Sequence, residues 1–96
     1  MNLTIGSQKI SADGVIGGSG KSIRIYGFIV SADSSGAVVT VYNGTGTGGV
    51  VMDSLVGTAS VSTRISYPGG LLLPAGCYLD IDAHTTYVVA IYSQEN

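Results

Sequence analysis

Short runs of β-branched and aromatic residues alternate with glycine- and serine-rich clusters along the whole chain. The clearest runs are 22–30, 37–42 and 60–67. Such residues fit the pleated, half-buried surface of a sheet, and glycine clusters separate one strand from the next. No segment keeps the hydrophobic period of a helix over a useful length. The pattern therefore predicts an all-β protein.

The spacing of turn residues predicts many short strands. Clusters of Gly, Pro, Asp and Ser at 33–36, 68–70 and 74–76 are typical of turns, and a further turn is expected at 83–86. Strands at this spacing indicate an antiparallel β-sandwich or a small barrel. We expect the strands near residues 2–6, 8–12, 22–32, 37–43, 49–56, 58–67, 71–73, 77–83 and 86–93.

Alternation with a period of two separates the two faces of several strands. In 58–67 and 77–82 the odd-numbered residues are expected to face the core and the even-numbered ones, including Asp80 and Asp82, to face solvent. The last run, 87–92, is apolar on both faces, which predicts either a central strand or a contact with another subunit. In 22–30 the expected shared face consists of Ile23, Ile25, Gly27 and Ile29.

The low charge of the chain limits what its surface can consist of. Charged residues make up 10% of the 96 residues, against about 25% in typical domains, and the net charge is −2. The surface must therefore be rich in Ser, Thr, Gly and Tyr, or partners must cover much of it. Four Lys and Arg residues are too few for a nucleic-acid interface, and no apolar run is long enough to span a membrane.

The chain is short enough for a single domain over 1–96. The Gly/Ser segment 17–20 is expected to be flexible, so residues 1–20 form either an arm that reaches a neighbour or an edge strand of the body, 21–96. The N-terminus lacks the basic and apolar regions of a secretory signal, and the single Cys77 precludes an intramolecular disulfide. Both features favour synthesis and folding in a cytoplasm.

Four features suggest chemistry, and each has a simpler structural explanation. Residues 14–22 resemble a phosphate-binding loop, but Val15 stands where that motif needs glycine, and a strand follows. Asp80 and Asp82 form a carboxylate pair or a solvated strand face. His84 is a general base for Ser or Cys77, or an ordinary turn histidine. One Cys and one His are too few ligands for a typical zinc site. We therefore expect no enzyme, no catalytic residue, no metal and no cofactor.

The aromatic residues are biased: six Tyr against one Phe and no Trp. Tyrosine suits positions with one apolar and one wet side, including interfaces. Strand-edge packing, a subunit interface and a sugar-binding site all remain open, and the candidates for sugar contact are Tyr26, Tyr42, Tyr67 and Tyr78. A low-charge surface also predicts a homo-oligomer. Its expected contacts are Tyr87, Val89, Ile91, Tyr26 and Tyr42.

The segment Gly69-Gly70-Leu71-Leu72-Leu73-Pro74-Ala75-Gly76-Cys77-Tyr78-Leu79-Asp80, followed by Val88-Val89-Ala90-Ile91-Tyr92, resembles the C-terminal part of small jelly-roll proteins of tailed-phage virions. The resemblance covers about the last third of the chain. It implies a jelly-roll-like sandwich, a homotrimer or other cyclic oligomer, and residence in the virion after assembly in the host cytoplasm. The implied function is capsid decoration or cement, through contact with the major capsid protein or other virion proteins. The alternative is the receptor- or glycan-binding head of a fibre or spike.

Overall fold

The computed structural model describes residues 5–94, which form strands and turns without a helix. This confirms the all-β prediction. Several strand boundaries differ from those expected from the sequence. The eight strands are β1 (Ile5–Ile10), β2 (Gly14–Ile16), β3 (Ile23–Ala32), β4 (Ala37–Asn43), β5 (Val50–Gly57), β6 (Ser62–Leu73), β7 (Cys77–Ile81) and β8 (Thr85–Gln94).

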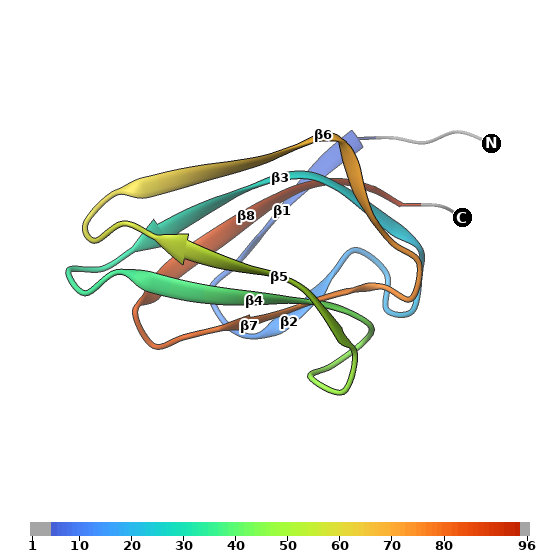
Figure 1. Ribbon diagram of the computed structural model, residues 1–96, viewed down its shortest axis with the longest axis horizontal. Helices are drawn as coiled ribbons and strands as arrows, with labels where there is room; N and C mark the ends of the chain where they lie inside the picture. Colours follow the sequence, from blue (N-terminus) through green and yellow to red (C-terminus); the bar gives the residue numbers. More distant parts are fainter. Residues whose placement is uncertain (1–4, 95–96) are drawn as a thin grey trace.

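The strands build two four-stranded sheets that pack face to face (Figure 1). The first sheet has the order β1-β8-β3-β6 and the second sheet has the order β2-β7-β4-β5. Every strand pair is antiparallel. An eight-stranded double sheet with these pairings has jelly-roll topology. The predicted single antiparallel sandwich of jelly-roll type is therefore confirmed.

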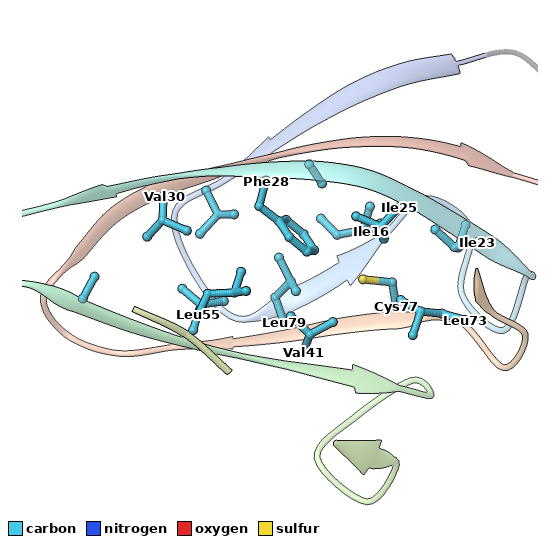
Figure 2. Close-up of a cluster of buried hydrophobic side chains, with 14 of the residues drawn as sticks. Ile16, Ile23, Ile25, Phe28, Val30, Val41, Leu55, Leu73, Cys77 and Leu79 are labelled. Carbon is cyan, nitrogen blue, oxygen red and sulfur yellow. The ribbon is translucent and has the colours of Figure 1, made fainter. Parts of the chain in front are cut away.

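The core fills the space between the two sheets (Figure 2). Phe28 from β3 is its largest fully buried side chain, and the ring of Tyr67 meets it edge-on at 6.0 Å between centroids. Such edge-to-face pairs add to the stability gained by burial alone. The remaining fully buried large side chains are aliphatic apart from Cys77: Ile16, Ile23, Ile25, Leu73, Leu79, Val30, Val39, Val41 and Val88.

A bulge in β3 corrects the face assignment made from the sequence. Pairing with both neighbouring strands shifts between Ile25 and Gly27, which leaves Tyr26 as an extra residue. An extra residue reverses the alternation beyond it. Phe28 and Val30 therefore join Ile25 in the core, whereas Ile29 points to the outer face. The prediction that Ile23, Ile25 and Ile29 share one face was wrong because a bulge leaves no mark on an alternating apolar run.

The expected turn at 68–70 is also wrong. β6 continues through these residues to Leu73, and residues 67–70 form a wide irregularity opposite Tyr26. Gly70 has φ 87°, and a Cβ there would approach the Arg24 side chain to 2.5 Å, so this path favours glycine. The strand expected over 58–67 begins only at Ser62, because 58–61 form the turn after β5.

The N-terminal segment departs from the expected pair of strands at 2–6 and 8–12. One strand, β1, runs along the edge of the first sheet, and the unexpected β2 runs along the edge of the second. Residues 1–4 lie outside the described part. The Gln8 side chain joins these two edges, because it donates to the Val15 carbonyl at 3.1 Å and accepts from the Gly17 N–H at 2.8 Å. Residues 5–16 thus contribute edge strands to both sheets of the same sandwich.

The strands nearest the C-terminus agree better with the sequence. β8 pairs with β1 on one side and β3 on the other, which confirms the central position expected from its apolar faces. Cys77 and Leu79 are buried as predicted. β7 ends at Ile81, so Asp82 belongs to the following turn and not to the strand. β4 has the predicted bounds, and β5 is displaced by one residue.

Candidate partner-binding surfaces

His84 lies in the turn between β7 and β8, where it meets the turn between β3 and β4. Its Nδ1 lies 3.1 Å from Oδ2 of Asp33, and its carbonyl accepts a hydrogen bond from the Asp33 N–H. Hydrogen bonds from the Ser35 N–H and from His84 lower the pKa of Asp33. Both side chains are about half exposed. The pair ties two turns together at one end of the sandwich.

The structure does not bring His84 to a nucleophile. Cys77 starts β7, whereas His84 follows the other end of that strand. The Cys77 side chain is fully buried, and burial raises the pKa of its thiol to about 12, so the reactive thiolate does not form near neutral pH. Between residues 5 and 94 the only side-chain hydrogen bond of the His84 ring is to Asp33. His84 therefore contacts Asp33, which ties two turns together, and it does not contact Cys77.

Asp80 and Asp82 do not form a carboxylate pair. Asp80 stays on the outer face of β7, beside Thr40. Asp82 turns back into the loop, where its carboxylate accepts hydrogen bonds from the N–H groups of Val38 and His84 and from the Thr85 hydroxyl. Within the described chain, no three His, Cys, Asp or Glu side chains are close enough to share a metal ion. Asp82 therefore stabilises the β7–β8 turn.

The five residues expected at an oligomer contact lie on opposite sides of the sandwich. Val89 and Ile91 point outward from β8, because their neighbours Val88 and Ala90 are in the core. Tyr87 shares this face, with the Lys9 ammonium 4.7 Å above its ring. The Tyr26 hydroxyl shares a hydrogen bond with the outward Ser93 hydroxyl at 3.1 Å. Four of the expected residues thus share the outer face of the first sheet.

Tyr42 lies on the outer face of the second sheet instead. It is paired with Tyr78 on β7, with ring centroids 6.3 Å apart, and with Val51 on β5. Of the four tyrosines considered for sugar contact, Tyr42 and Tyr78 are the two whose rings form a pair. Tyr67 is turned toward the core, where its hydroxyl donates to Asp53. A single contact surface cannot contain all five expected residues of one copy.

The sequence reading missed an exposed apolar surface on β4 and β5. Val38 and Val56 lie opposite each other on the outer face of the second sheet, and Val51 lies on the same face two rows away. Val51 is 55% exposed and Val56 68%. We call Val38, Val51 and Val56 the valine surface. The alternation of residues 54–56 could have predicted this surface. Ser54 and Val56 lie on the outer face of β5, whereas Leu55 between them is buried.

No helix of the described residues has the length and hydrophobicity needed to span a membrane. Comparisons of the chain with protein-family models, curated proteins and solved structures found no match.

Proposed function

We propose that this protein acts by binding and not by catalysis, as a structural subunit of a phage virion that decorates or cements the capsid. The observation that carries the binding role is the valine surface. Val38 and Val56 are directly paired, and Val51 lies on the same face beyond the Thr40–Ser54 row. Apolar groups exposed on one face mark interaction sites when they form a continuous patch, and Tyr42 beside Val51 adds aromatic surface to this face. The phage setting rests on the sequence resemblance and on the low charge of the chain.

The mechanism is the burial of apolar surface. Each copy lies over a joint between capsid subunits, and the valine surface contacts the major capsid protein or another virion protein. Val51 and Val56 each expose more than half of their surface, so a partner removes most of this area from water. Burying one such side chain contributes about 1.5–3 kcal/mol at most, and many copies on one shell multiply the effect. Exposed Met52 in the adjoining bulge of β5 extends the contact.

A second candidate is the glycan-binding head of a fibre or spike. It is favoured by the neighbouring rings of Tyr42 and Tyr78, which are half-buried on an outer sheet face. Asp80 and Thr40 form the next paired row on that face, where a carboxylate and a hydroxyl are available to sugar hydroxyls. Amphipathic aromatic rings beside hydrogen-bonding groups suit such ligands.

Co-sedimentation with capsid shells tests the proposal. Shells that lack this protein are incubated with the wild type or with the double variant Val51→Lys/Val56→Lys. We expect the wild type to pellet with the shells and the double variant to stay in solution. Leu72→Lys is the matched control, because Leu72 is an exposed apolar residue of β6 on the other sheet. Equal binding by the wild type and the double variant would contradict the proposal.

The variant Tyr42→Ala/Tyr78→Ala separates the two candidates. If the protein is a glycan-binding head, this variant loses binding to oligosaccharides, and the valine variant retains it. If the protein is a cement protein, neither the wild type nor any variant binds oligosaccharides. Circular dichroism confirms in each case that the variant keeps the β-sheet spectrum of the wild type.

A further inference from the structure

Cations gather on the outer face of the first sheet. The strand pairings place Lys9, Val89, Ile29 and Arg64 side by side in one row across β1, β8, β3 and β6. Arg24 lies in a parallel row near the other end of the same face. Three of the four Lys and Arg residues therefore share this face, and no acidic residue of the described chain lies on it. We call it the basic face.

The turn between β3 and β4 and the turn between β7 and β8 lie at one end of the sandwich (Figure 1). Acidic residues gather at this end. Asp33 and Asp82 are held there by the turn hydrogen bonds described above. Asp13 reaches the same end, since its carboxylate accepts from the Ile81 N–H at 2.8 Å. Asp80 adjoins this end on the outer face of β7. We call Asp13, Asp33 and Asp82, together with the adjoining Asp80, the acidic end.

Both carboxylates that hold the turns stay ionised near neutral pH. The Ser35 N–H and His84 lower the pKa of Asp33. Partial burial opposes ionisation of Asp82, but hydrogen bonds from Thr85, Val38 and His84 outweigh it and lower its pKa. The one close contact between a basic and an acidic side chain in the described chain is that between His84 and Asp33. Neither the three cations of the basic face nor Asp80 and Asp13 form an ion pair within residues 5–94, so their charges are available to a partner.

Each of the two surfaces also carries apolar groups. On the basic face, Ile29, Val89 and Ile91 are half-buried side chains at the centre of the sheet. At the acidic end, Val61 in the β5–β6 turn is 49% exposed, and Val38 lies beside Asp82. Apolar contact supplies affinity, whereas charge complementarity selects the partner and the orientation.

We propose that copies of this chain associate head to tail, with the basic face of one copy on the acidic end of the next. Two basic faces repel each other, because their charged side chains are all cationic. Two acidic ends also repel each other, because their four carboxylates outnumber the single histidine, His84. A second copy satisfies both surfaces at once. The proposal concerns self-association, and it holds whether or not the assembly binds a capsid.

The two surfaces lie on different parts of one copy, which makes the contact heterologous. The strand pairings place the cations of the basic face on the outer side of the first sheet, and hydrogen bonds hold Asp33 and Asp82 in turns at one end of the sandwich. Heterologous contacts close into a ring where the rotation between copies closes, and they build an open filament where it does not. A ring agrees with the cyclic oligomer expected from the sequence, and it leaves most of the valine surface free for another protein.

Charge reversal tests the proposal. Arg64 on the basic face and Asp80 near the acidic end have no hydrogen-bond partner for their side chains within residues 5–94, so their replacement leaves internal contacts intact. Sedimentation equilibrium at low salt measures the dissociation constant of the wild type, of Arg64→Glu, of Asp80→Lys and of the double variant. Lys21→Glu is the matched control, since it changes the charge equally in an exposed loop before β3.

We expect each single reversal to weaken association at least tenfold and the double variant to recover most of the loss. Lys21→Glu should resemble the wild type, and added salt should weaken association, because charges farther apart than about 10 Å are screened at 0.1 M. A wild type that stays monomeric up to about 1 mM, or a double variant weaker than both singles, overturns the proposal. These outcomes do not depend on capsid co-sedimentation, so failure of either proposal is seen separately.

Discussion

The hydrogen bond between Tyr67 and Asp53 closes one side of the sandwich. Tyr67 belongs to β6, an edge strand of the first sheet, and Asp53 belongs to β5, an edge strand of the second. The Tyr67 hydroxyl donates to Oδ2 of Asp53 at 2.5 Å, while Oδ1 accepts from the Ser54 N–H. Tyr67→Phe keeps the ring that packs on Phe28 and removes only this bond. We therefore expect it to test the bond without opening a cavity.

The expected loss of stability follows from the charge and the burial of the pair. Hydrogen bonds to charged groups contribute about 1.5–3 kcal/mol, but Asp53 is only half-buried, so water replaces part of the lost interaction. We expect Tyr67→Phe to lower the free energy of unfolding by about 1–2 kcal/mol. In a domain of this size, each kcal/mol shifts the midpoint of thermal unfolding by about 4–8 °C. Urea unfolding at neutral pH and calorimetry measure both quantities.

A control variant and a double-mutant cycle test this prediction. Tyr87→Phe is the matched control, because the Tyr87 hydroxyl forms no hydrogen bond in the described chain and its loss should cost less than about 0.5 kcal/mol. A double-mutant cycle with Asp53→Ala isolates the interaction between the two side chains. If Tyr67→Phe costs the same in the Asp53→Ala background as in the wild type, the bond between the edges contributes nothing and the reasoning fails.

Tyr67→Phe should also change how the stability of the protein depends on pH. Burial, the hydrogen bond to Asp53 and its negative charge raise the pKa of Tyr67 above the usual value of about 10. The folded state therefore favours the neutral phenol. Its stabilising contribution is complete below about pH 10 and is lost as the pH rises above it. Wild-type stability should fall at alkaline pH, and Tyr67→Phe should fall less steeply. Parallel curves for the two proteins would refute this assignment.

Three further substitutions test other parts of the fold. Asp82→Ala removes the acceptor of three hydrogen bonds in the β7–β8 turn and should cost about 1–3 kcal/mol in urea unfolding at neutral pH. Because the pKa of Asp82 is lowered in the folded protein, this contribution should vanish as the pH falls below about 4. Cys77→Ser places a hydroxyl in the core and should cost about 1–3 kcal/mol, while Cys77 itself should resist thiol reagents until the protein unfolds. Gly70→Ala should cost about 1–2 kcal/mol in thermal unfolding, since φ 87° and the nearby Arg24 side chain both disfavour a Cβ.

The fold class and the central strand followed from local patterns in the sequence. Alternation in 77–81 and the doubly apolar run 87–92 report directly on burial, and burial is what those strands experience. The errors lie where one residue changes the geometry. Tyr26 is an extra residue in β3, and 68–70 bend β6 without ending it. Bulges arise from the register between two strands, so neither strand alone predicts them.

The candidate contact residues show the same limit. Tyr26 and Tyr42 both follow from the tyrosine bias, yet the fold places them on opposite outer faces. Position along a strand predicts which face of that strand a side chain occupies. It does not predict which sheet the strand joins. The assignment of Tyr26 to the first sheet and of Tyr42 to the second depends on the jelly-roll order, which the hydrophobic pattern does not encode.

The separation of positive and negative side chains on the folded surface is the property that the sequence predicts least. It is also the property that is most informative about partners. Lys9, Arg24 and Arg64 are scattered along the chain, and none lies in a basic cluster. They share one face because β1, β3 and β6 belong to the same sheet, while every described aspartate lies in the second sheet or in a turn that joins the two sheets. None of the described Lys and Arg residues forms an ion pair with an aspartate. The one contact of that kind in the described chain is that of His84 with Asp33. Charges that do not stabilise the fold are free to orient one copy against another.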